Sequence, residues 1–129
     1  MHKFAPSIFL MCILALLFSA CGKASDPAVK VVEDYVNALV NKDANTISAL
    51  SCADWESNAM LELDSLQAVS TRLENLACTN TGTEGTTTQV ACQGKIIATY
   101  DNEDQQLDLS VRVYQVIKQG GEYQVCGYK

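Results

Sequence analysis

The pattern of apolar and polar positions predicts helices in the first half of the folded chain. From Ala28 to Asn41 the apolar residues recur three or four positions apart, which is the spacing of an amphipathic helix. Asp26 and Pro27 stand where the N-cap and the first helical residue are expected. Shorter helical patterns follow over Ala44–Ser51 and from near Asp54 to about Leu63. We therefore expect three consecutive helices.

The second half alternates apolar and polar residues, as strands with one buried face do. The expected strands cover about 72–80, 87–100, 106–117 and 122–128. Residues 79–88 are rich in Thr and Gly and predict a hairpin loop, while Asp101–Asp104 and Gly120-Gly121 predict two further turns. The sequence thus predicts an α+β fold, in which three N-terminal helices pack on a four-stranded antiparallel meander.

One face of this predicted sheet collects most of its apolar side chains. With turns at these positions, the apolar face holds Val90, Cys92, Ile96, Ala98, Tyr100, Leu107, Leu109, Val111, Val113, Ile117 and Cys126. The opposite face holds Gln93, Lys95, Thr99, Asp108, Ser110, Arg112 and Tyr114, with Ile97, Val116 and Val125 as apolar exceptions. Because an apolar face must be buried, we expect the helices to cover it.

The N-terminus has the pattern of a secretory signal, with a lysine near the start, an apolar run and a small pair before Cys21. Leu17–Cys21 resembles the lipobox of bacterial lipoproteins, although Phe18 departs from the usual Leu, Val or Ile. The resemblance implies that Cys21 carries diacylglycerol and palmitate and anchors the protein to a membrane of the cell envelope, on its extracytoplasmic side. An ordinary secretory signal is the alternative.

This interpretation divides the chain into a lipoprotein signal peptide (1–20), a lipidated cysteine with its tether (21–26) and a folded domain (27–129). The whole chain has a formal net charge of −6, and removal of the signal peptide takes Lys3 and the only histidine, His2, with it. An acidic domain has no basic surface for nucleic acid. Without histidine it also lacks Ser-His-Asp and Cys-His catalysis, so we expect no nucleic-acid partner, no cofactor and no metal site.

Four cysteines remain in the expected domain, and an exported protein meets an oxidising compartment, so they predict two disulfides. No CxxC pair supports a zinc site. In a simple meander Cys92 and Cys126 lie two strands apart, beyond the ~7 Å that a disulfide allows between Cα atoms. Cys78 would lie further still from Cys126, which leaves the pairs Cys78 with Cys92 and Cys52 with Cys126.

The order of elements and the last strand, Gly121–Tyr128, are similar to those of the nuclear transport factor 2-like (cystatin-like) fold. In that fold the last strand often reads Gly-x-(Trp or Tyr)-x-Val. With the lipobox, the chain resembles small bacterial lipoproteins of unknown function that carry this domain. The resemblance implies a sheet bent into a cone around the helices. The cone holds a ligand or an active site in some members, and in others the sheet binds another protein.

The sequence offers only a few residues for such a site. Tyr35, Trp55, Tyr100 and Gln115 are candidates to line a cavity, although aromatic residues at these spacings also fit a core. No catalytic residue is identified, because the carboxylates of Asp34, Asp43 and Asp54 fit helix caps or exposed helix faces. We expect a non-enzymatic, membrane-tethered module that binds a small apolar ligand or a partner protein. The alternatives are a small isomerase- or dehydratase-like enzyme and a structural or dimerising module, whose sheet could form a homodimer.

Overall fold

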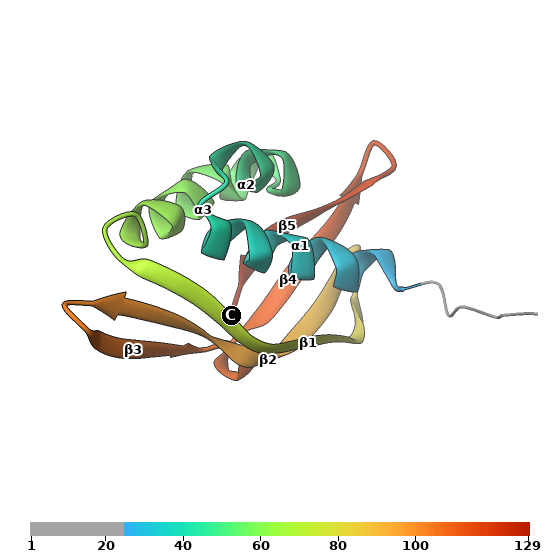
Figure 1. The fold of residues 1–129 in the computed structure, drawn as a ribbon. Coiled ribbons are helices and arrows are strands. Elements are labelled where there is room, and N and C mark those ends of the chain that lie inside the picture. Colours follow the sequence, from blue (N-terminus) through green and yellow to red (C-terminus); the bar gives the residue numbers. More distant parts are fainter. Residues whose placement is uncertain (1–24) are drawn as a thin grey trace, which may run out of the picture.

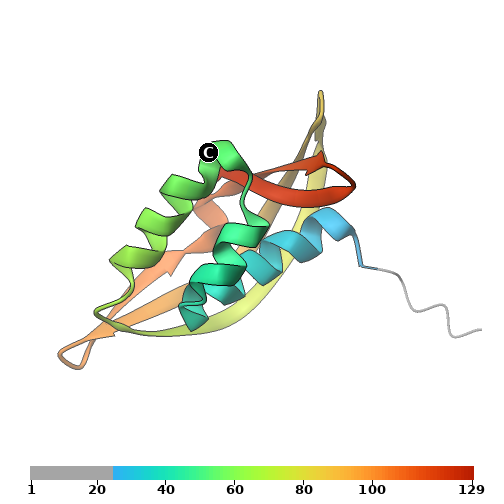
Figure 2. The same ribbon diagram turned by 90° about the horizontal axis from the view of Figure 1, so that it is seen from above.

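The computed structural model describes residues 25–129 as helices packed on a strongly curved antiparallel sheet (Figure 1 and Figure 2). The helices come first: α1 Pro27–Asn41, α2 Ala44–Leu50 and α3 Ala53–Ser65. The strands follow: β1 Ser70–Glu84, β2 Thr87–Tyr100, β3 Glu103–Asp108, β4 Val113–Gln119 and β5 Glu122–Tyr128. The α+β prediction is confirmed. The expected signal peptide and Cys21 lie outside the described residues.

The helix boundaries follow local capping signals. The Asp26 carboxylate accepts a hydrogen bond from a backbone amide in the first turn of α1, and Pro27 is the first helical residue. Lys42 ends this helix in the left-handed conformation, with a φ of 57°, and the Asp43 side chain then caps α2. Helix α3 continues to Ser65, slightly beyond its predicted end. Side-chain capping therefore fixes where α1 and α2 begin, and a left-handed residue fixes where α1 ends, whereas α3 begins after Cys52 without a side-chain cap.

The sheet has five strands, not the four expected. Its order is β1-β2-β4-β5, and β3 pairs with the part of β2 that β4 leaves unpaired. The additional strand arises because the predicted strand 106–117 is divided by a short 3-10 helix, η1 Leu109–Val111. The sequence predicted helices only in the N-terminal half, and this prediction is wrong for η1, which lies between β3 and β4.

The β1–β2 hairpin is longer than predicted. Strand β1 extends past the expected range 72–80 at both ends, and residues 79–88 are mostly strand instead of loop. Only residues 85–86 form the turn. Cross-strand pairing, which a local pattern does not reveal, allows these polar Thr-rich segments to form strands.

A bulge in this hairpin requires glycine. Gly94 has a φ of 105° next to a shift in the β1–β2 register, and a Cβ at this position would lie 2.5 Å from the carbonyl oxygen of Glu74. No other residue fits so close to the neighbouring backbone. Such a bulge increases the local bend and twist of a sheet, consistent with the curvature seen in Figure 2.

The connection from β2 to β3 is tighter than predicted. Asp101 and Asn102 both have positive φ values, 48° and 64°, as a two-residue type I′ hairpin turn requires. Ile96 consequently pairs with Leu107, and not with Leu109 as a four-residue loop would give. The acidic stretch 101–104 is therefore half turn and half strand.

The 3-10 helix η1 reverses the predicted faces of β4. A turn that breaks the strand also breaks its alternation, so the following residues point to the opposite sides of the sheet. Tyr114 and Val116, expected on the outer face, are fully buried. The residues of this segment that were expected inside are half-buried or exposed: Val111, Val113 and Ile117.

Two disulfides connect these elements. Cys52–Cys126 joins the start of α3 to β5, with 5.3 Å between the Cα atoms, and Cys78–Cys92 joins directly paired residues of β1 and β2, with 4.0 Å. This is the pairing derived from the sequence. The Cys52 amide also donates to the carbonyl oxygen of Val125 at 2.9 Å, so the segment before α3 covers the outer edge of β5.

The concave face of the sheet contains the main core. Helix α1 packs across β1, β2, β4 and β5, while α2 and α3 contact each other and β5. The largest fully buried side chains on this side are Tyr35, Tyr114, Leu39, Ile47, Leu63, Ile96 and Leu109. Within residues 25–129 no helix combines the length and the apolar character that crossing a membrane requires.

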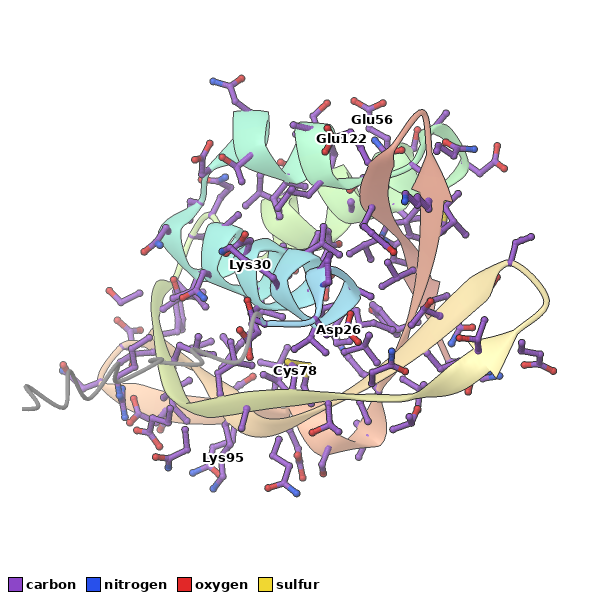
Figure 3. The ribbon with its side chains drawn as sticks, turned by 90° about the vertical axis from the view of Figure 1, so that its right-hand side faces the viewer. Asp26, Lys30, Glu56, Cys78, Lys95 and Glu122 are labelled. Atoms are coloured by element: carbon purple, nitrogen blue, oxygen red, sulfur yellow. A yellow bond between two sulfur atoms is a disulfide. The ribbon has the colours of Figure 1, made fainter. Side chains whose placement is uncertain are left out.

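The convex face is polar but has one buried apolar residue, Ile97, which is 1% exposed and lies apart from the main core. Its direct cross-strand neighbours are Arg72 on β1 and Gln106 on β3. Lys95 donates to the Gln106 side chain at 2.9 Å. In Figure 3, Lys95 points away from the helices, whereas Cys78 lies between the sheet and α1. Long hydrogen-bonded side chains thus cover Ile97 on this face.

Candidate functional site

A cleft of about 440 Å³ opens between α3 and the part of the sheet formed by β2, β3 and β5. Its apolar lining residues are Trp55, Leu61, Leu66, Ile96, Leu107 and Tyr128. Its polar lining residues are Asn58, Glu62, Ser65 and Arg112. In Figure 1, β3 and the C-terminal end of α3 lie at the end of the molecule away from the start of α1. A concave, mainly apolar site of this size with few polar groups is typical of small-molecule binding.

A half-buried ion pair forms the polar part of the cleft. The Arg112 guanidinium donates through Nη1 to Oε1 of Glu62, and the two side chains are only 17% and 13% exposed. The other carboxylate oxygen, Oε2, accepts from the Tyr35 hydroxyl at 3.1 Å, and this hydroxyl in turn accepts from Nε1 of Trp55 at 3.2 Å. Helices α1 and α3 and the segment before β4 therefore meet through one hydrogen-bonded chain.

Aromatic rings hold the arginine in place. The Arg112 guanidinium lies over the Tyr128 ring, 4.1 Å from its centroid, and Tyr128 packs edge-to-face on Trp55 at 5.5 Å. Gly127 lies beneath Trp55, where a Cβ would approach the indole to 3.3 Å. The stacking fixes the plane of the guanidinium and so the direction of its donors.

The charges and the burial shift the pKa values of this cluster. Burial, together with the Glu62 carboxylate, raises the pKa of Tyr35 far above its ordinary value, so this hydroxyl stays protonated. Burial alone would lower the pKa of Arg112, but the charge and the hydrogen bond of Glu62, together with the nearby Tyr114 hydroxyl, more than compensate and raise it. Burial raises the pKa of Tyr114 to about 12, although the nearby Arg112 opposes this shift. Around neutral pH the cluster thus carries one positive and one negative charge.

The Tyr114 hydroxyl is the one buried side-chain polar atom among residues 25–129 that has no hydrogen-bond partner. Its ring packs edge-to-face against Tyr35 and Tyr128, with centroid distances of 6.2 and 5.7 Å. The charge of Arg112 lowers the pKa of this hydroxyl, but the two groups form no hydrogen bond of normal geometry. A buried hydroxyl without a partner costs about 1–3 kcal/mol, so this position lowers the stability of the fold.

The candidate residues named from the sequence are only partly brought together. Trp55 lines the cleft, and Tyr35 lies directly behind it, bonded to Glu62. Tyr100 does not contribute, because it is 63% exposed at the end of β2. Gln115 is half-buried and its amide donates to the carbonyl oxygen of Val113, outside the cleft lining.

The outer face predicted from the sequence, which placed Arg112 and Tyr114 beside Lys95 and Thr99, does not exist as a unit. The reversal of β4 places Tyr114 in the concave core, and Arg112 lines the cleft, while Lys95 remains on the convex face. Sequence reasoning also missed Glu62. It lies three residues after Ala59 and seven after Trp55, on the buried side of α3, and this spacing was the available signal.

A scan against models of protein families and a search of curated proteins each find no match to this sequence. Solved structures do resemble it. A candidate ketosteroid isomerase from Shewanella frigidimarina is 12% identical, with a TM-score of 0.56 over 81% of this chain and 94% of its own. A nuclear transport factor 2-like protein with a cystatin-like fold from Novosphingobium aromaticivorans is 14% identical, with a TM-score of 0.51 over 79% and 77%.

A SEC-C motif containing protein from Rhodopseudomonas palustris is similar to the same extent, with 12% identity and a TM-score of 0.53 over 81% of this chain and 80% of its own. Identities this low show the fold alone. The chain therefore has the nuclear transport factor 2-like, cystatin-like fold, which occurs in ketosteroid isomerase-like enzymes and in binding modules. Because one fold supports many functions, the residues of the cleft, and not the fold, indicate what this chain does.

Proposed function

We propose that this chain is a lipid-anchored protein of the cell envelope whose domain binds a small, mainly apolar molecule in the cleft. The cleft between α3 and the sheet carries this proposal, because its walls are apolar and its polar groups are few and mostly fixed. The volume of about 440 Å³ suits a small ligand. The signal-like N-terminus and the lipobox-like Leu17–Cys21 support the anchor.

Binding is favoured over catalysis by the ion pair of Glu62. One of its oxygens accepts from Arg112 and the other from the Tyr35 hydroxyl. Taking up a proton as a general base would break this ion pair, whereas the lone pairs that remain on the carboxylate can accept hydrogen bonds from a ligand without breaking it. The geometry thus describes a fixed polar surface for recognition.

The ligand-binding proposal is tested with N-phenyl-1-naphthylamine, a neutral apolar dye that fluoresces in apolar surroundings. We expect saturable fluorescence with a domain that comprises residues 25–129 and has both disulfides intact. Leu61→Glu places a charge on the cleft wall and should weaken binding at least about tenfold. Tyr100→Glu is the matched control, since Leu61 and Tyr100 are similarly exposed, at 66% and 63%, and only Leu61 lines the cleft. Equal effects of the two substitutions would contradict a ligand site in the cleft.

The anchor is tested by the intact mass of the protein purified from membranes. We expect a mass that corresponds to a chain starting at a diacylated or triacylated Cys21. Cys21→Ser should abolish the lipid and the membrane association, whereas Cys12→Ser, in the apolar run of the signal, should leave both unchanged. An unlipidated mature chain from the wild-type gene would rule out the lipoprotein assignment.

Glu62 also supports a second candidate function, a small isomerase- or dehydratase-like enzyme, because a carboxylate and the Tyr35 hydroxyl lie together at an apolar cleft. Its test is conversion of a bound ligand, followed by mass spectrometry and chromatography of the ligand after incubation. Turnover that Glu62→Gln abolishes while binding persists would establish catalysis. Unchanged ligand after saturating incubation favours the binding module.

A partner protein or a homodimer bound through the sheet is the remaining proposal from the sequence. The convex face gives it less support, because its long side chains are engaged with one another, including Arg72 with Asp104 and Lys95 with Gln106. Light scattering of the purified domain distinguishes monomer from dimer. A dimer that Lys95→Glu disrupts would favour the sheet as an interface.

A further inference from the structure

We propose that the cleft selects neutral ligands whose polar head both donates and accepts hydrogen bonds, such as a hydroxyl or a primary amide, over carboxylate or ammonium heads. This inference rests on the proposed ligand-binding function and specifies the chemistry of the ligand. Its basis is that the cleft is electrically neutral although the chain carries a formal net charge of −6. The charged lining residues are Glu62 and Arg112, which neutralise each other, and Asn58 and Ser65 are uncharged.

Donors and acceptors lie side by side in this polar part. A guanidinium has five N–H groups, and Arg112 makes one hydrogen bond to the described residues, through Nη1 to Glu62. A carboxylate has about four acceptor positions, and Glu62 uses one on each oxygen. The stacking of Arg112 on Tyr128 keeps the guanidinium plane fixed. A hydroxyl or amide can accept from the arginine and donate to the glutamate at the same time.

An ionic head gains less in the same position. A ligand carboxylate that approaches Arg112 also approaches Glu62, which repels it, and an ammonium meets the reverse arrangement. Neither ion receives a net compensating charge from the cluster, yet each loses its hydration in a cleft whose charged side chains are only 17% and 13% exposed. The buried Tyr35 hydroxyl stays protonated and adds no charge. A neutral head has a much smaller hydration to lose.

Four ligands with the same apolar chain test the selection: decan-1-ol, decanamide, decanoate and decylammonium. Trp55 is the only tryptophan of the chain and lines the cleft, so its emission reports occupancy directly. At pH 7 we expect the alcohol and the amide to bind at least about tenfold more tightly than either ion. Decanoate or decylammonium binding as tightly as decan-1-ol would overturn the inference.

Variants of the ion pair sharpen this test. Glu62→Gln keeps the shape and the hydrogen bonding but leaves Arg112 without its counter-charge, so we expect decanoate to become the tightest ligand. Arg112→Gln leaves Glu62 alone and should favour decylammonium. Asp104→Asn is the matched control, since it removes one negative charge from an exposed ion pair on the convex face and should leave the ranking unchanged. A control that shifts the ranking as Glu62→Gln does would show that net charge, and not the cleft pair, sets the preference.

The possible outcomes distinguish a failure of the neutral-ligand selection from a failure of the proposed ligand binding. If none of the four ligands changes Trp55 emission and N-phenyl-1-naphthylamine does not bind, the ligand-binding function itself fails. If the dye binds and an ionic head is preferred in the wild-type domain, ligand binding stands and only the neutral selection is wrong. Wild-type measurements decide both points even if a variant does not fold.

Discussion

The two arginines of the chain, Arg72 and Arg112, each pair with a carboxylate, but on opposite faces of the sheet. Arg72 bonds to Asp104 and Glu74 on the convex face, where its side chain is 52% exposed. Arg112 bonds to Glu62 in the cleft, where it is 17% exposed and stacked on Tyr128. Both contacts are arginine–carboxylate ion pairs, but they differ in solvent exposure and therefore in their contribution to stability. Water screens the first pair, whereas removal of one partner of the second leaves a charge without compensation.

The largest effect should follow Arg112→Met. This change leaves Glu62 half-buried without its cation, and we expect the free energy of unfolding to fall by about 3 kcal/mol. Urea or guanidinium unfolding of the domain under non-reducing conditions measures it. A loss below about 1 kcal/mol would mean that the cleft pair is as well solvated as the convex one.

The second-largest loss of stability should occur at high pH, because the tyrosines buried beside Arg112 must then ionise. The pKa of Tyr114 is raised to about 12 in the folded protein, against about 10 in an unfolded chain. The folded state therefore holds this proton more tightly, and its contribution is complete below pH 10 and lost as the pH rises through 12. We expect a loss of about 2 kcal/mol over this range from Tyr114.

Tyr114→Phe tests this assignment when stability is measured from pH 8 to 12. The variant should lose less stability than the wild type above pH 10. At pH 7 it should be at least as stable, since its missing hydroxyl has no partner in the described structure. Identical pH profiles of the two proteins would contradict burial as the cause of the shift.

A smaller effect is expected when both charges of the cleft pair are removed. The double variant Glu62→Met with Arg112→Met replaces the pair by apolar side chains, and we expect unfolding free energy within about 1 kcal/mol of the wild type. The double-mutant cycle then gives the coupling between the two residues. If the double variant loses as much as Arg112→Met alone, the arginine contributes mainly through its packing on Tyr128, and not through its charge.

The smallest effect should follow Arg72→Met on the convex face. Exposed ion pairs contribute little, so we expect a change of at most about 0.5 kcal/mol that is reduced in 1 M NaCl. The same unfolding measurement at low and high salt decides it. A loss comparable to that of Arg112→Met would show that the polar network over Ile97 is cooperative.

The sequence predicted the elements better than their faces. The helices were predictable because apolar residues recur along them with helical spacing, and Asp26 and Asp43 mark the N-caps of the first two. The disulfide pairing was predictable because strand spacing limits which cysteines can meet. The faces of β4 were not, since they depend on the 3-10 helix over Leu109–Val111, whose sequence also fits a continuous strand.

The candidate site illustrates the same limit. Trp55 and Tyr35 were identified from helical spacing, and both take part in the cleft cluster. Glu62 was overlooked because a carboxylate on an amphipathic helix is ordinarily solvated, and Arg112 was assigned to the wrong face. Their contact joins positions that are fifty residues apart in the chain. No local pattern records such a pair, since each residue alone resembles a surface charge.

The sequence by itself determined the class of fold, the N-caps of the first two helices, the acidic charge and the four cysteines that form two disulfides. Only the tertiary structure decided which arginine is solvated and which lies in the cleft. The physical reason is that hydrophobic periodicity and capping act over a few neighbouring residues, whereas burial of a charge depends on which distant elements pack around it. One short turn between β3 and β4 is enough to move Tyr114 from the outer face to the core, and Arg112 to the cleft.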